Sequence, residues 1–185
     1  MRPFPQVVPR AADISFDERL VEPFVAQTLY VFARLFDWNL EPEPPHAKCC
    51  VAPTFDVSGV IRLTGRVRGG VVLSLSRVTA CRATELLLER PFRYLNDDVA
   101  DAVRELTNTV TGRAAGLLHR DRVRFGLPKA VIGHTRPLEW PAGVEPFVIE
   151  FHSTTDALAL ELGLEADPAD PVLAGGSASP GAVLF

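Results

Sequence analysis

The chain has 185 residues, of which 47% are hydrophobic and 23% charged, and its formal net charge at pH 7 is −4. This length suits one domain with a buried core, and no apolar run approaches the roughly 20 residues of a membrane-spanning helix. Basic residues are scattered singly in a chain of negative net charge, a pattern that disfavours nucleic-acid binding.

The first predicted element is a helix from about residue 22 to 37, where apolar residues recur at helical spacing. Pro23 fits its first turn, and SFDE at 15–18 is a capping pattern that either starts this helix or forms a separate turn. Residues 1–15 are proline-rich without periodicity, so we predict an irregular arm. They lack the apolar stretch of a signal peptide, which makes the cytoplasm the expected location.

Strands are predicted after this helix, at 47–55 and then as a pair at 60–64 and 71–75 around a glycine-containing connection. Ser76 is the expected cap of a second helix, which Pro91 ends. These elements form a compact run in the sequence, so we expect the strands to pair as a meander.

A long third helix is predicted from about residue 97, and three strands follow it at 128–134, 146–153 and 157–164. Because strands occur in runs rather than alternating singly with helices, we predict an α+β fold. Its sheet should be largely antiparallel, with amphipathic helices packed on it. We assign the domain to 16–163 and a flexible tail to 164–185, which is rich in Pro, Gly and Ala.

The long helix, within NDDVADAVRELTNTVTGRAAGLLHRD at 96–121, has two distinct faces. At about 100° per residue, the face expected to pack on the sheet consists of Val99, Val103, Leu106, Val110, Ala114 and Leu117. Four residues spaced at i, i+4, i+7 and i+11 line the opposite face: Asp101, Glu105, Asn108 and Gly112. We call these four residues the stripe and expect them to face solvent.

The stripe is not built for helix stability. Asp101 and Glu105 are like charges one turn apart, a penalty that Arg104 can offset, and Asn108 is a poor helix former. Gly112 costs about 1 kcal/mol relative to alanine. One interpretation is an ordinary solvent-exposed face, since amphipathicity demands only polar residues there. Several residues that are unfavourable in a helix lie together on this exposed face, which favours a functional site instead.

The residue types indicate what such a site could do. Asn108 has a donor and an acceptor that suit holding a water, Glu105 suits a partner's lysine, and Gly112 leaves room for close approach. The stripe contains no nucleophile. The three cysteines and four histidines show neither a disulfide framework nor metal-ligand spacing. We therefore expect no metal site and three buried cysteine side chains.

In these residues the chain resembles the CheX, CheC and FliY class of chemotaxis phosphatases, and CheX-type domains most of all. That class shows an acidic or serine residue, three residues, Glu, two residues and Asn, which stand here as Asp101, AVR, Glu105, LT and Asn108. Pro128 is the candidate for the later proline. VEPFVAQTLYVF and DVSGVIRLTGRVRGGVVLSLS resemble the same family, although Glu22 stands where it has a small polar residue. The resemblance spans about 20–162, and a single ExxN copy favours the CheX-like form.

The resemblance implies a phosphatase that hydrolyses the aspartyl phosphate of a CheY-like response-regulator receiver domain, in chemotaxis or related two-component signalling. Glu105 and Asn108 would be catalytic, pairing with the receiver's lysine and orienting the attacking water, and Asp101 and Gly112 would bind the partner. The protein would need no cofactor of its own, because the Mg²⁺ belongs to the receiver. A homodimer through sheet edges is also implied. The alternative is a non-catalytic binding or scaffold module of the same fold in signalling or motility.

Overall fold

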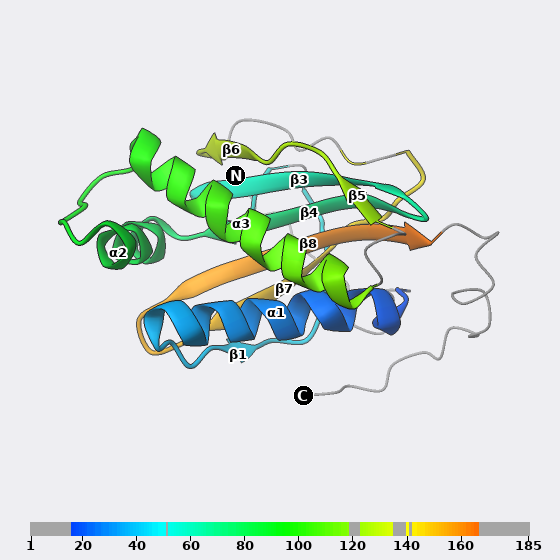
Figure 1. Ribbon diagram of the computed structural model, residues 1–185, viewed down its shortest axis with the longest axis horizontal. Coiled ribbons are helices and arrows are strands. Elements are labelled where there is room, and N and C mark those ends of the chain that lie inside the picture. Colours follow the sequence, from blue (N-terminus) through cyan, green and yellow to red (C-terminus); the bar gives the residue numbers. More distant parts are fainter. Residues whose placement is uncertain (1–15, 51, 119–122, 135–139, 141, 167–185) are drawn as a thin grey trace, which may run out of the picture.

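The computed structural model of the protein describes residues 16–50, 52–118, 123–134, 140 and 142–166. Figure 1 shows a twisted sheet with two long helices lying across one of its faces. The helices are α1 (Glu18–Phe36), α2 (Arg77–Leu88) and α3 (Asp97–Leu117). The strands are β1 (Glu41–Pro42), β2 (His46–Ala47), β3 (Val57–Gly65), β4 (Val67–Leu75), β5 (Val123–Phe125), β6 (Lys129–Ile132), β7 (Phe147–His152) and β8 (Ala157–Ala166).

Within these residues the sheet has eight strands in the order β1-β7-β8-β4-β3-β5, while β2 also pairs with β7 and β6 with β3. Every pairing is antiparallel, which confirms the predicted α+β fold. The ladder between β4 and β8 reaches from Leu75↔Leu158 to Val67↔Ala166, so β8 continues past the domain end assigned at 163. The predicted arm at 1–15 and residues 167–185 of the predicted tail lie outside the described residues.

The core lies between the helices and the sheet. Helices α1 and α3 cross the same face side by side, and α2 packs against α3 near its beginning (Figure 1). Alternate residues of the central strands point toward them, because side chains on a strand alternate between its two faces. The largest fully buried side chains include Phe24, Phe32, Ile61, Leu73, Leu75, Leu158, Leu160 and Leu162.

Helix α1 begins earlier than predicted. Its N-cap is Asp17, whose side chain accepts a hydrogen bond from the Arg19 backbone N–H at 3.0 Å. The helix therefore starts at Glu18, and the predicted start near residue 22 with Pro23 in the first turn was wrong. Pro23 lies inside the helix, where it has no backbone N–H to donate to the carbonyl four residues earlier. Hydrogen bonds from the Arg19 side chain and backbone hold the pKa of Asp17 below its ordinary value.

The predicted strand at 47–55 was also wrong, because only β2 at its start joins the sheet. The residues that follow are held by side chains on the face of the sheet opposite the helices. Lys48 Nζ lies 2.8 Å from Glu161 Oε2, with both side chains buried. The backbone N–H and hydroxyl of Thr54 donate to Glu161 Oε1 at 2.7 and 2.8 Å. A buried ion pair thus replaces the expected strand ladder.

Candidate functional site

Helix α3 carries the candidate site, and local capping fixes where it begins. The Asn96 side-chain oxygen accepts a hydrogen bond from the Val99 backbone N–H at 3.0 Å. Asp97 and Asp98 occupy the first turn, where the helix dipole favours negative charge. These contacts start the helix at Asp97, as predicted.

The apolar face of α3 packs on the sheet. Five of the six residues predicted for this face are buried, whereas Leu117 in the last turn is 58% exposed. At mid-helix, a Cβ added to Gly59 of β3 would collide with Thr107 Oγ1 and lie 2.7 Å from Thr107 Cβ. The helix therefore rests directly on the β3 backbone. Since Asn108 follows Thr107, this contact fixes the position of Asn108 above the sheet.

The stripe faces solvent, as predicted. Asp101, Glu105 and Asn108 are exposed and Gly112 is half-buried. A Cβ on Gly112 would meet nothing within 4 Å, so the space above this turn is open. The structure thus brings all four predicted site residues onto one accessible surface of α3.

Arg104 neutralises much of the negative charge at the start of the stripe. Its Nε lies 3.1 Å from Asp101 Oδ1, and its Nη1 lies 2.8 Å from Glu105 Oε1. The hydrogen bond to Asp101, aided by attraction to both carboxylates, raises the pKa of the Arg104 guanidinium. The Glu105 side chain is 57% exposed, so it contacts Arg104 but remains accessible to a partner.

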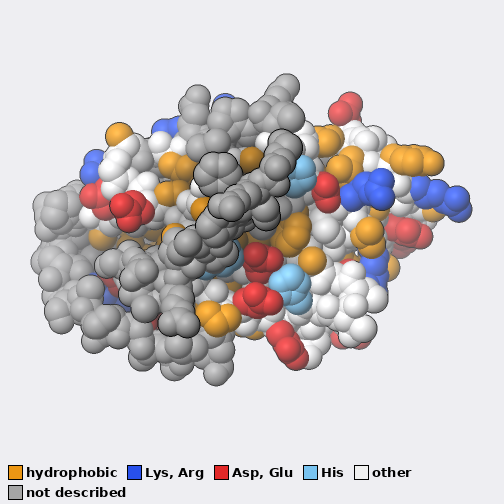
Figure 2. Space-filling view, turned by 180° about the vertical axis from the view of Figure 1, so that it is seen from behind, with side chains coloured by type: hydrophobic (Ala, Val, Ile, Leu, Met, Phe, Trp, Pro, Cys, Tyr) orange, Lys and Arg blue, Asp and Glu red, His pale blue; other side chains and the backbone are white. Residues whose placement is uncertain are grey.

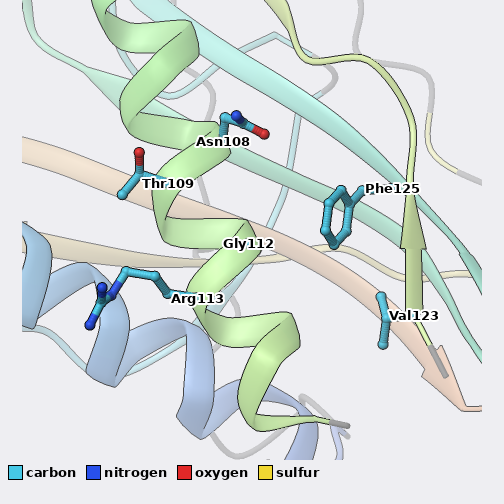
Figure 3. A pocket seen from close by; sticks show the side chains of 6 residues that line it. All are labelled: Asn108, Thr109, Gly112, Arg113, Val123 and Phe125. Atoms are coloured by element: carbon cyan, nitrogen blue, oxygen red, sulfur yellow. The ribbon is translucent and has the colours of Figure 1, made fainter. Parts of the chain in front are cut away.

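Beside the stripe, a groove of about 520 Å³ separates α3 from β5. Its lining residues are Asn108, Thr109, Gly112, Arg113, Val123 and Phe125. Figure 3 shows the Asn108 amide pointing toward the β5 side of the groove, with the Phe125 ring facing the helix across it. We call this feature the α3–β5 groove. The stripe and the groove share Asn108 and Gly112, so they form one continuous surface.

The far wall of this groove was missed from the sequence. Strand β5 has three residues, and Phe125 pairs with Leu63 of β3. Cross-strand partners share a face of the sheet, so Phe125 lies on the helix side beside buried Leu63. The alternation Arg122, Val123, Arg124, Phe125 is a short period-2 signal that could have revealed the strand.

Arg113 lines the groove, but its guanidinium group contacts helix α1. Its Nε donates to Gln27 Oε1 at 2.8 Å, and its guanidinium lies 4.4 Å from the centre of the Tyr30 ring. Both partners belong to α1, and Figure 3 shows the side chain pointing to that side of the helix. Arg113 therefore ties α3 to α1 and leaves the groove largely neutral.

The three cysteines do not belong to the stripe. Cys81 is buried, and desolvation raises the pKa of its thiol, which disfavours the reactive thiolate. Cys49 and Cys50 are exposed, so the expectation of three buried cysteines was wrong for two of them. Both belong to the segment that Lys48 anchors on the opposite face of the sheet.

Histidine and acidic side chains meet on the back of the molecule, where Figure 2 shows them side by side. His152 Nε2 lies 3.4 Å from Glu43 Oε1 and 3.5 Å from Glu150 Oε2, and His46 Nε2 lies 3.8 Å from Glu150 Oε1. These side chains lie at the edge of the sheet and, apart from exposed Glu43, are half-buried. Among the described residues, no group of three or more His, Cys, Asp or Glu side chains could hold a metal ion.

The part of the chain that contains α3 matches a known protein family. The family model of the chemotaxis phosphatase CheX matches residues 57–152, more than half of the chain. The protein belongs to the CheX family. The match covers β3 to β7 and includes all of the stripe. No protein of curated function matches the chain significantly.

Solved structures of CheX and CheC-like proteins share this fold. The chemotaxis protein CheX from Vibrio vulnificus has 27% sequence identity and a TM-score of 0.70, covering 79% of this chain and 99% of that one. A CheC-like superfamily protein from Shewanella sp. PV-4 has 23% identity and a TM-score of 0.73, covering 82% and 100%. A CheX-CheY-BeF3-Mg²⁺ complex from Borrelia burgdorferi has 20% identity and a TM-score of 0.66, covering 79% and 97%. In the described part of the chain, no helix is long and apolar enough to span a membrane.

Proposed function

We propose that this CheX-family protein hydrolyses the aspartyl phosphate of a CheY-like receiver domain, in chemotaxis or related two-component signalling. The observation that carries the proposal is the exposed pair Glu105 and Asn108, on adjacent turns of the helix that the CheX match includes. The known complex of a CheX protein with CheY, BeF3 and Mg²⁺ supports a receiver as the partner class.

In this proposal Asn108 positions the attacking water. Its amide can accept a hydrogen bond from the water and donate one to a phosphoryl oxygen, which holds the water close to phosphorus. An acyl phosphate is already reactive, so orientation alone can supply a large acceleration. The seating of Thr107 on Gly59 supports this role, because it leaves little freedom for the backbone that carries Asn108.

Glu105 docks the receiver by pairing with its active-site lysine. In the free protein the Glu105 carboxylate contacts Arg104. When the receiver binds, this carboxylate must either release Arg104 and pair with the lysine or contact both cations at once. Arg104 keeps its second contact with Asp101 during this exchange. Asp101 thereby assists partner binding, because it holds the Arg104 guanidinium away from the incoming lysine.

The protein supplies no cofactor in this scheme. Any Mg²⁺ sits on the receiver, where it neutralises charge on the phosphoryl group. Glu105 and Asn108 act only on groups that the receiver presents. We also propose that the protein forms a homodimer through a sheet edge, which sedimentation velocity would detect as a concentration-dependent doubling of mass.

The test follows the loss of phosphate from each purified receiver encoded in the same genome, with the protein and its variants added. Asn108→Ala should lower the rate on the order of a hundredfold, and Glu105→Gln should mainly raise KM. Asn39→Ala and Glu85→Gln make the same chemical changes at exposed positions outside α3 and should retain activity. If no receiver loses phosphate faster with the wild-type protein, but one binds it, the protein is a binding module rather than a phosphatase.

A further inference from the structure

The α3–β5 groove lies directly beside the proposed catalytic pair. Gly112 is one turn beyond Asn108, a distance of about 6 Å along the helix axis. The groove is about 520 Å³, enough for one or two apolar side chains, and it is open above Gly112. We propose that this groove takes an apolar side chain from the receiver loop next to the phosphorylated aspartate. The inference rests on the proposed function.

The position of the phosphorylation site explains why a loop must lie there. Receivers have a doubly wound α/β fold, whose sites lie among the loops at the carboxyl ends of the strands. If Asn108 enters such a site, the flanking loops surround this part of α3. A loop that passes the next turn lies over Gly112, where the absent side chain leaves room for its backbone.

The lining of the groove indicates the chemistry of what enters it. Phe125 is 46% exposed although its β5 neighbour Val123 is buried, so an apolar ring stands uncovered at the wall. None of the six lining residues is acidic, and Arg113, the one charged member, is turned toward Gln27 and Tyr30. The acidic half of the stripe attracts the receiver's lysine, and the neutral groove then accommodates an apolar neighbour.

Two variants test the groove in opposite ways. Gly112→Leu fills it, and Phe125→Ala removes its wall. Neither should unfold the protein, since a Cβ at Gly112 meets nothing within 4 Å and Phe125 is half-exposed on a short edge strand. Leucine is also a better helix former than glycine, so Gly112→Leu should melt at the wild-type temperature or above it.

Binding is measured by fluorescence anisotropy with a labelled receiver carrying BeF3 and Mg²⁺, a mimic of the phosphorylated state, and turnover is measured in parallel. Both groove variants should weaken binding roughly tenfold or more and raise KM while leaving kcat nearly unchanged. Leu127→Ala removes an 89% exposed apolar side chain on the same edge, and Ala33→Leu adds one to α1. Both controls should bind within about twofold of the wild-type protein.

The outcomes separate the two proposals. If Asn108→Ala abolishes turnover but both groove variants bind and turn over like wild type, the groove inference is wrong and the phosphatase remains. If no receiver binds the wild-type protein, both proposals are wrong. If Gly112→Leu changes only the sedimentation of the protein alone, a second copy rather than a receiver occupies the groove.

Discussion

Gly59→Ala tests whether α3 is seated on the backbone of β3 as described. The added Cβ would lie 2.7 Å from Thr107 Cβ and 3.0 Å from the Val103 carbonyl oxygen, besides colliding with Thr107 Oγ1. Carbon atoms in good contact are about 3.5 to 4.0 Å apart, so helix and strand must separate by roughly 1 Å. Such overpacking costs about 1 to 3 kcal/mol of unfolding free energy.

The assay is urea unfolding, with the free energy taken from the midpoint and slope. Gly112→Ala is the matched control, because its Cβ meets nothing within 4 Å and the helix should gain up to about 1 kcal/mol. Combining Gly59→Ala with Thr107→Ala removes the nearest clashing atom, so the two changes should be non-additive by about 0.5 kcal/mol or more.

The same displacement should reach the site. Asn108 follows Thr107, and a misplacement of about 1 Å can cost on the order of a hundredfold in rate. Gly59→Ala should therefore lower kcat while the folded protein still binds the receiver. If Gly59→Ala unfolds at the wild-type urea concentration, the helix does not rest on Gly59 and the proposed control of Asn108 fails.

Three further changes have defined outcomes. Asp17→Ala should lower the unfolding free energy by about 1 kcal/mol at pH 7. Because the folded-state pKa of Asp17 is lowered, this stabilisation is present above its ordinary pKa of 3.8 and disappears as the pH falls through the folded value; an equal loss at pH 2 and 7 would contradict it. Lys48→Met leaves the buried Glu161 carboxylate without its cation and should lower the free energy of urea unfolding by about 3 kcal/mol, whereas no loss would refute the buried pair. Adding Glu161→Gln, which removes the charge but keeps an acceptor for Thr54, should recover part of that loss. Arg104→Gln frees Glu105 and should tighten binding of the BeF3-loaded receiver about twofold to fivefold at low salt, while weaker binding would show that Arg104 itself contacts the receiver.

Local patterns predicted the parts of the fold that local interactions determine. Two runs of strand-forming residues around a glycine-containing connection located parts of β3 and β4, and Ser76 caps α2 by accepting a hydrogen bond from the Thr79 N–H at 3.2 Å. Helical periodicity assigned the two faces of α3 because the sheet buries one side along most of its length. The exposure of the stripe follows from that same periodicity, so its residues could be named in advance.

The start of α1 was missed although its Asp17 cap is local, whereas the other errors come from contacts between segments far apart in the sequence. The 47–55 segment has strand-forming residues, but the pairing of Lys48 with Glu161 holds it on the back of the sheet instead. Phe125 could be placed beside α3 only once β5 was known to pair with β3. The contacts of Arg104 with Asp101 and Glu105 could be predicted from their spacing on the helix. The α3–β5 groove, in contrast, depends on long-range packing that no local pattern encodes.

In the proposed mechanism, Asn108 accelerates hydrolysis rather than binding, and this role can be tested by itself. It is tested most directly by the first-order loss of phosphate from a labelled receiver, with saturating wild-type protein or Asn108→Ala, after anisotropy has shown that both bind. We expect fast loss of phosphate with the wild-type protein and a rate near the receiver's own with Asn108→Ala. Equal rates for the two saturated complexes would contradict it.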